Sequence, residues 1–324
     1  MLDQPLPRLY CSRCIEFAYC RFDGAIIRSD LVRELKERAE IVHDCPEVGI
    51  GLGIPRRPVR IVRTGEEDRL IQPATGSDHT GKMENYVSDL FERAGEVDGF
   101  ILKSKSPTCG MGDVKIYPKM EKSKMVGLGD GFLGKEVSAG YSHLAVEDEK
   151  RLDDPTIRDH FLTKLYTLAR FRLMKGSGKS RDLIRFHSQH KFLLMAYSQK
   201  ELKELGRIVA GQKGSRFENV LDQYGIHLSK AMARGPKYTS NINVLMHCFG
   251  YVSDEMSREE KGFYLDLLDA YKDDRVPLAT CKQVMLSYVI RFQVDYLEDQ
   301  YYFRPYPAEL APGFDPKRDR ELWK

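Results

Sequence analysis

The sequence predicts an α/β N-terminal domain with a mostly parallel sheet at residues 1–152, followed by a separate all-α domain at residues 153–324. The chain has 324 residues, more than one hydrophobic core usually supports, so two domains are expected. Strand-like and helix-like segments alternate in the first half, which is typical of a parallel sheet. From about Asp154 the strand signals stop and apolar residues recur at helical spacing, which predicts the all-α half.

The composition limits the class of protein. Apolar residues make up 42% of the chain and charged residues 31%, as in ordinary globular domains. The formal charge of +3 is too small to indicate nucleic-acid binding by itself. No apolar run approaches the roughly 20 residues that a membrane span needs, and the first residues lack a signal-peptide pattern. We therefore expect a cytoplasmic protein with no membrane partner, whose cysteines are reduced.

The first half contains the elements of strand–helix–strand units. In chain order they are a strand beginning at Leu9, a helix at Ser29–Ala39 capped by Ser29, a strand at Ala39–Val42, a short strand at Arg60–Arg63, a polar loop at Gly65–Gly76, an amphipathic helix at Thr80–Ala94 and a strand at Val97–Leu102.

The second half contains a series of helices. They are expected at Thr156–Met174, at Asp182–Tyr197, from Ser198 to Val209 with Glu201 completing a capping box, and at Arg216–Arg234, Thr239–Val252, Ser257–Tyr271 and Pro277–Leu297. The proline-rich end, Tyr301–Lys324, predicts an extended tail.

Cysteines follow three of the predicted strands. Cys45 lies three positions after the strand at Ala39–Val42, within the glycine-rich stretch HDCPEVGIGLGIPRRP that also holds Glu47. Cys109 follows the strand at Val97–Leu102, and Cys14 follows the first strand. Because the carboxyl ends of parallel strands line one crevice, we expect Cys14, Cys45 and Cys109 to face the same crevice.

Three thiols at one crevice suit more than one chemistry. They can hold a zinc ion with an open fourth position, or a 4Fe–4S cluster in which one iron has no protein ligand. An open iron is a Lewis acid that can bind a sulfur atom of a substrate. The spacing of the three cysteines does not distinguish a zinc ion from a 4Fe–4S cluster, and it is also compatible with three unrelated core cysteines.

Three separated motifs resemble the signature stretches of the thiouracil desulfidase family. They are CSRC…CRFDG, HDCPEVGIGLGIPRRPVRI and LKSKSPTCG, which agree with the family in order and spacing over roughly residues 8–150. In the second half, FHSQHKFLLMAYS at Phe186–Ser198 and NVLMHCFGY at Asn243–Tyr251 resemble the helical companion domain found fused to desulfidases.

The resemblance implies a 4Fe–4S cluster held by Cys14, Cys45 and Cys109, with one open iron. In the family the open iron is thought to bind the sulfur of a 2-thiouracil-type thiocarbonyl. Water then attacks the carbon, and sulfide leaves onto the iron with no net redox change. Glu47 fits the acid/base that activates water, and Ser106 fits a hydrogen-bonding helper.

Purely structural roles are the alternatives for these residues. Glu47 can be a surface carboxylate paired with Arg56 or Arg57, and Ser106 can be a turn residue before Pro107. Cys11 and Cys20 are extra thiols where the family commonly has apolar residues, and we expect them to serve packing rather than metal binding.

Two functional hypotheses follow. The first is an enzyme that removes sulfur from a small thiolated nucleobase or nucleoside of the 2-thiouracil type, by non-redox hydrolysis that releases sulfide. The alternative is a metal-stabilised binding module that recognises thiolated RNA or nucleotides without turnover, and a fourth protein ligand from Cys11 or Cys20 would favour it. Nucleic acid is the less favoured partner, because basic stretches such as Lys175–Arg185 are usually solvated helix faces.

Overall fold

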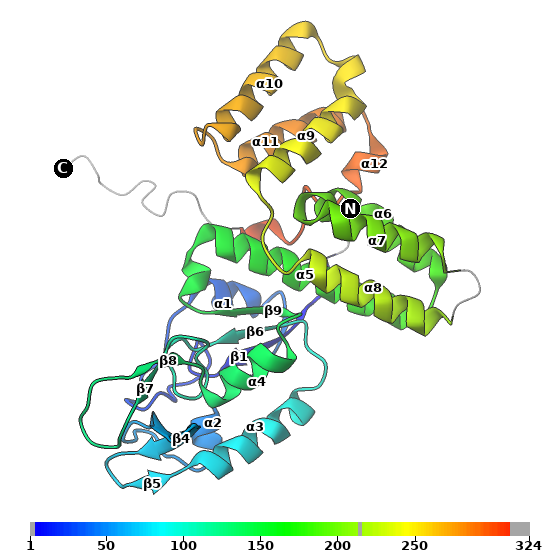
Figure 1. Ribbon diagram of the computed structural model, residues 1–324. Coiled ribbons are helices and arrows are strands. Elements are labelled where there is room, and N and C mark those ends of the chain that lie inside the picture. The colour runs from blue at the N-terminus through cyan, green and yellow to red at the C-terminus, as the bar shows by residue number, and fades with distance from the viewer. Residues whose placement is uncertain (1–3, 213–215, 312–324) are drawn as a thin grey trace, which may run out of the picture. The chain divides into compact units, whose positions relative to one another are not determined.

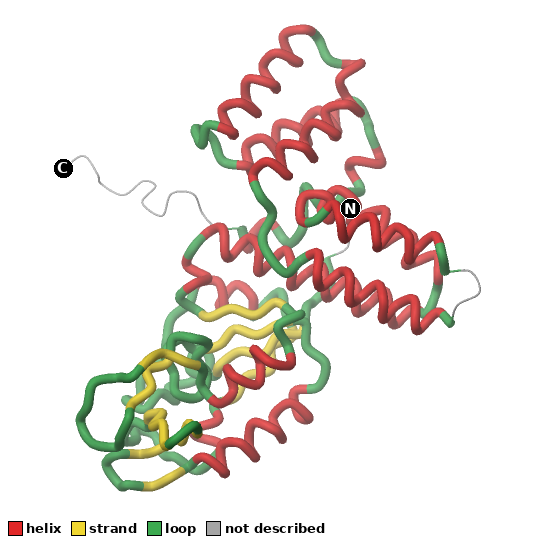
Figure 2. Tube along the Cα trace, in the orientation of Figure 1, coloured by secondary structure: helices red, strands yellow, loops and turns green. Residues whose placement is uncertain are grey.

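The computed structural model describes residues 4–212 and 216–311. Within these ranges it divides into an α/β unit, residues 6–169 and 308–311, and a helical unit, residues 4–5 and 170–307. Figure 2 shows strands in the α/β unit and helices through the second half of the chain. The predicted fold class, an α/β domain with a mostly parallel sheet and a separate all-α domain, is therefore confirmed. The division falls within α5 (Pro155–Ser177), and the predicted domain boundary at residue 152 stays a prediction.

A four-stranded sheet with only parallel pairs forms the centre of the α/β unit. Its strands are β1 (Arg8–Ser12), β2 (Glu40–Asp44), β6 (Gly99–Leu102) and β9 (Ala145–Asp148), in the spatial order β2-β1-β6-β9. Strand β1 is central, and its residues Leu9–Cys11 are fully buried. The chain continues from β1 to β2 on one side, whereas β6 lies on the other side. Such a reversal of strand order creates a crevice at the carboxyl ends of the strands, where ligands bind.

Two helices of this unit form where the sequence predicts them. Helix α1 (Asp30–Leu35) begins at Ser29, whose hydroxyl accepts a hydrogen bond from the Val32 amide at 3.3 Å. Helix α3 (Thr80–Ala94) has the predicted bounds and buries its apolar face, Met83, Val87 and Leu90, in the core beneath the sheet. Figure 1 shows α3 beside α4 (Phe132–Gly140).

The predicted loop at Gly65–Gly76 is wrong, because β4 (Glu67–Gln72) lies there. Gly65 adopts a φ of +65°, which lets the chain turn back so that β4 pairs antiparallel with β3 (Arg60–Thr64). Only one face of β4 is buried, around Leu70, so the strand carries few apolar residues and gives a weak sequence signal. A second sheet results, in the order β5-β4-β3-β7-β8. Its other strands are β3 (Arg60–Thr64), β5 (Ser77–Asp78), β7 (Val114–Tyr117) and β8 (Gly127–Gly129).

The helical unit contains the predicted series of helices. Their bounds are α6 (Ser180–Tyr197), α7 (Gln199–Ala210), α8 (Phe217–Ala231), α9 (Tyr238–Val252), α10 (Arg258–Lys272), α11 (Leu278–Arg291) and α12 (Asp295–Glu298). Ser198 caps α7 as predicted, but the Glu201 carboxylate bonds His227 Nδ1 at 2.7 Å and not the Ser198 amide.

Two predictions for the end of the helical half are wrong. The single helix predicted at Pro277–Leu297 ends at Arg291, and Gln293, with a φ of +55°, separates it from α12. The predicted extended tail is not free at its beginning, because the aromatic side chains of Tyr301, Tyr302 and Phe303 are buried in the helical core. Residues 312–324 of that tail lie outside the described residues. None of the described helices has the combined length and apolar character of a membrane span.

Candidate functional site

A cavity of about 400 Å³ lies at the carboxyl ends of the parallel strands. Segments that follow all four strands line it, and it contains every predicted site residue. Its chemically notable lining residues are Ser12, Cys14, Cys20, Cys45, Glu47, Arg56, Lys103, Ser104, Ser106, Thr108, Cys109 and Glu149. The inference that parallel strand ends bring Cys14, Cys45 and Cys109 to one crevice therefore agrees with the structure.

The cavity thiols are shielded from solvent. Cys14 and Cys109 are 9% and 6% exposed, and Cys45 is half-buried. Burial raises the pKa of Cys109 to about 12. The pKa of Cys45 is raised as well, first by its hydrogen bond with Cys20 and then by burial. A metal group would have to displace the protons of these thiols, because the ligand form of cysteine is the thiolate.

The donor set of this cavity consists of thiols, the soft ligands that both a zinc ion and a 4Fe–4S cluster take. Among the described residues, no three His, Cys, Asp or Glu side chains stand at the spacing of a single-ion site. Soft thiolates from Cys14, Cys45 and Cys109 around one cavity have the chemistry that such a cluster requires.

Glu47 is buried beside the cysteines and is not a surface carboxylate. It lies in the short helix α2 (Pro46–Gly49), directly after Cys45, and is 9% exposed. Arg56 donates to its Oε2 from Nη2 at 2.6 Å and from Nε at 2.9 Å. The Thr108 hydroxyl donates to Oε1 at 3.1 Å, so Glu47 links the Cys45 and Cys109 segments.

Ser106 organises the turn that presents Cys109. Its hydroxyl accepts hydrogen bonds from the amides of Thr108 at 3.2 Å and of Cys109 at 3.1 Å. Burial is the main cause of the raised pKa of Cys109, and the nearby hydroxyls of Ser12 and Ser106 act in the opposite direction. Ser106 is therefore both a turn residue and a neighbour of a predicted ligand.

Glycines allow α4 to pack directly on the Cys109 segment. A Cβ on Gly134 would lie 2.0 Å from the Gly110 carbonyl oxygen, and a Cβ on Gly131 would lie 2.5 Å from the backbone of Thr108. Both contacts are with backbone, which cannot move aside cheaply. The N-terminal half of α4 thus supports the loop that carries Cys109.

A buried ion pair in the cavity wall was not predicted from the sequence. Lys103 Nζ lies 2.6 Å from Glu149 Oε1, and the Glu149 carboxylate also accepts from the amide of Ser104 at 2.7 Å and its hydroxyl at 2.9 Å. Glu149 follows β9, a four-residue strand that was not predicted. The available sequence signal was the short apolar pair Ala145-Val146, which could have indicated a strand. Glu149 would then have been expected at a fourth strand end.

The two extra thiols of this region differ in position. Cys11 is fully buried in β1 and does not line the cavity. Cys20 lines the cavity and is 2% exposed. The Cys45 thiol donates to the Cys20 carbonyl oxygen at 3.9 Å, and the neighbouring Cys14 thiol is the first cause that raises the pKa of Cys20 to about 11.

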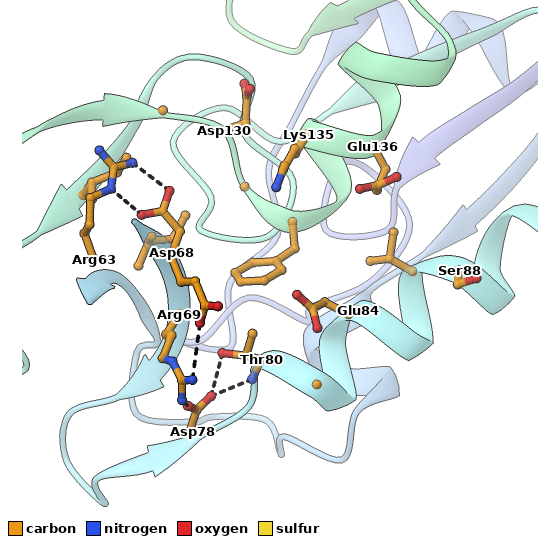
Figure 3. A pocket seen from close by; sticks show the side chains of 18 of the residues that line it. Arg63, Asp68, Arg69, Asp78, Thr80, Glu84, Ser88, Asp130, Lys135 and Glu136 are labelled. Atoms are coloured by element: carbon orange, nitrogen blue, oxygen red, sulfur yellow. Dashed lines mark hydrogen bonds and ion pairs between the residues drawn. The ribbon is translucent and has the colours of Figure 1, made fainter. Parts of the chain in front are cut away.

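A larger cavity of about 1300 Å³ lies elsewhere on the α/β unit (Figure 3). Charged side chains dominate its wall, and several of them pair with one another. Arg63 binds Asp68 at 2.8 Å and Arg69 binds Asp78 at 2.9 Å. It contains no cysteine, so volume alone does not make it the better candidate for the chemistry of this chain.

Comparison with known proteins gives two family matches. A family model described as 2-thiouracil desulfurase matches residues 9–149, and a model described as a protein of unknown function (DUF1722) matches residues 191–307. The chain is 28% identical over 163 residues to Uncharacterized protein YbgA of Escherichia coli strain K12, covering 50% of this chain and 94% of that protein. It is 32% identical over 108 residues to Uncharacterized protein YbbK of Bacillus subtilis strain 168, covering 31% of this chain and 72% of that protein.

A similar solved structure is that of a 4Fe-4S-dependent thiouracil desulfidase, TudS. It is 26% identical, with a TM-score of 0.37, and the match covers 46% of this chain and 93% of that chain.

Proposed function

Because residues 9–149 of this chain belong to the 2-thiouracil desulfurase family and a DUF1722 domain follows them, we propose that the chain is a desulfidase that hydrolyses a thiolated pyrimidine. The substrate class is a small 2-thiouracil-type nucleobase or nucleoside. In the overall reaction water supplies the oxygen, a C–O bond forms, the C–S bond breaks and hydrosulfide leaves. No electrons are gained or lost.

One observation carries the proposal. Cys14, Cys45 and Cys109, from three different strand ends, line the same cavity as the buried carboxylate of Glu47. Three unrelated core cysteines would have no reason to share a cavity with an acid/base group. The convergence of soft ligands and a carboxylate suits a reaction in which sulfur is the leaving atom.

The three cysteines are the residues that would hold a 4Fe–4S cluster. Such a cluster, when bound, supplies an iron without a protein ligand, which acts as a Lewis acid toward the substrate sulfur. The buried walls around Cys14 and Cys109 keep bulk water from the thiolates. The hydrogen bonds of Ser106 fix the turn that aims the Cys109 side chain.

Glu47 is the residue that handles the proton of the attacking water. Its Oε2 is engaged twice by Arg56, whereas Oε1 accepts one bond, from the Thr108 hydroxyl. A carboxylate oxygen has more than one acceptor site, so Oε1 can also accept a water proton. Arg56 and Thr108 hold the carboxylate in one orientation, which general-base catalysis requires.

Turnover of a free thiobase tests the proposal. The full chain, purified and reconstituted with iron and sulfide without oxygen, is incubated with 2-thiouracil, and released sulfide and uracil are both quantified. We expect the two products in equal amounts, with many turnovers per chain. Tight binding of the thiobase without product would contradict the enzyme and support the alternative binding module. Product formation that requires an added reductant would contradict the non-redox reaction.

A further inference from the structure

Phe22 is an aromatic residue of the 400 Å³ cavity that the proposed reaction does not use. It lies two positions beyond Cys20, and it is the one aromatic side chain among the described residues that line the cavity. Phe22 is 42% exposed although it is apolar. Pockets for small ligands commonly use such apolar and aromatic side chains as walls, whereas their polar groups fix the orientation of the ligand. The exposed ring is therefore available to a ligand of this cavity.

A tight turn presents the Phe22 ring. The Gly24 amide donates to the Arg21 carbonyl oxygen at 3.0 Å, which closes a turn over the two residues between them. Arg21 and Asp23 pair across this turn at 3.1 Å, and the Asp23 carboxylate also accepts from the Ala25 amide at 3.0 Å. The turn restrains the backbone at Phe22 before a ligand binds, so a contact with the ring costs less conformational entropy.

Arg56 ties this turn to Glu47. Its backbone amide donates to the Phe22 carbonyl oxygen at 2.8 Å, and its Nη2 donates to Oε2 of Glu47 at 2.6 Å. One residue thus holds both the backbone of Phe22 and the proposed acid/base group. A substrate ring bound on Phe22 would keep a constant position relative to Glu47, which attack by an activated water requires.

The environment of the Phe22 ring suits a flat ligand. The guanidinium carbon of Arg21 lies over the ring, 5.7 Å from its centroid. In residues 4–212 and 216–311, no second aromatic ring stacks on Phe22. Nucleobases stack on exposed aromatic side chains, because every base has a π-face. A pyrimidine is therefore the kind of ligand that this ring can bind.

We propose that Phe22 is a substrate-binding residue on which the pyrimidine ring of the thiolated base stacks, so that the site selects aromatic thiobases over saturated ones. This inference rests on the proposed function for the identity of the substrate. The sulfur and oxygen substituents of a pyrimidine lie in the plane of its ring. Stacking on Phe22 leaves these substituents at the edge of the base, where the thiols and polar groups of the cavity can reach them.

The test compares Phe22→Leu, Phe22→Tyr and the matched control Phe263→Leu with the wild-type full-length chain. Leucine is apolar but has no π-face, whereas tyrosine keeps the ring. Phe263 is 57% exposed on α10 and does not line the cavity. Each chain is reconstituted with iron and sulfide without oxygen, and its iron content and its kcat and KM for 2-thiouracil are measured. Calorimetry gives the Kd for uracil, which is not consumed, and for 5,6-dihydrouracil, whose ring is saturated.

We expect the four chains to hold the same amount of iron. In Phe22→Leu, the Kd for uracil and the KM for 2-thiouracil should rise about 10-fold, because stacking supplies a large part of the affinity for a base. The kcat should change little, because the ring moves neither a proton nor sulfur. The wild type should bind uracil more tightly than dihydrouracil, and Phe22→Leu should lose this preference. Phe22→Tyr and Phe263→Leu should behave as the wild type.

Three results would overturn the inference. They are an unchanged Kd and KM in Phe22→Leu, equal binding of uracil and dihydrouracil by the wild type, and loss of iron in Phe22→Leu with normal iron in Phe22→Tyr, which would make the ring structural. A wild-type chain that binds uracil through Phe22 but releases no sulfide from 2-thiouracil would contradict the proposed function and still support the stacking contact.

Discussion

Replacing Cys14, Cys45 or Cys109 by alanine is expected to abolish both iron binding and desulfuration. Each residue supplies one thiolate from a separate strand end. We expect each single variant to hold at most a small fraction of the wild-type iron and to release no measurable sulfide from 2-thiouracil. Iron content by metal analysis and sulfide release report the two effects separately.

Cys11→Ala is the control for this series. Cys11 lies in the centre of β1, fully buried and outside the cavity, so its loss removes packing but no ligand. We expect this variant to keep its iron and its activity, with a modest loss of stability. Equal tolerance of alanine at Cys11, Cys14, Cys45 and Cys109 would end the cluster hypothesis.

Glu47→Gln is expected to leave the iron in place and to lower turnover by about 100-fold or more, because a positioned acid/base group usually contributes 10²–10⁴-fold. Glutamine keeps the size of the side chain and can still accept from Thr108, but it cannot take up a proton from water. The rate constant for sulfide release at saturating 2-thiouracil measures the effect, with iron content determined on the same samples.

The exposed Glu67 of β4 provides the matched carboxylate for comparison. Its side chain is 76% exposed and lies outside the 400 Å³ cavity, so Glu67→Gln should turn over as the wild type does. Turnover of Glu47→Gln within a few-fold of the wild type would show that the carboxylate serves only its ion pair with Arg56.

The site residues that could be predicted from the sequence are those that come after regular apolar strands. β1, β2 and β6 each have apolar residues and are followed by a cysteine, so their strand ends and their shared crevice could be inferred. The residue types at positions 45 and 47 also indicated a site. The partners of Glu47 could not be deduced, because Thr108 is 61 residues away and meets it only through the tertiary fold.

The strands that could not be predicted are short or exposed on one face. β4 buries mainly Leu70, and β9 has only four residues and ends in acidic ones, so neither shows a clear alternation. Missing β9 also hid Glu149 and its ion pair with Lys103. The break at Gln293 depends on a single residue with a positive φ, which no periodic pattern reveals.

Iron and acid-labile sulfide content after purification without oxygen, together with a visible absorption spectrum, is the decisive measurement for the cluster. We expect about four irons and about four sulfides per chain with broad visible absorption. Zinc alone, or no metal after careful anaerobic reconstitution, would contradict the cluster at Cys14, Cys45 and Cys109 and leave the binding module as the better hypothesis.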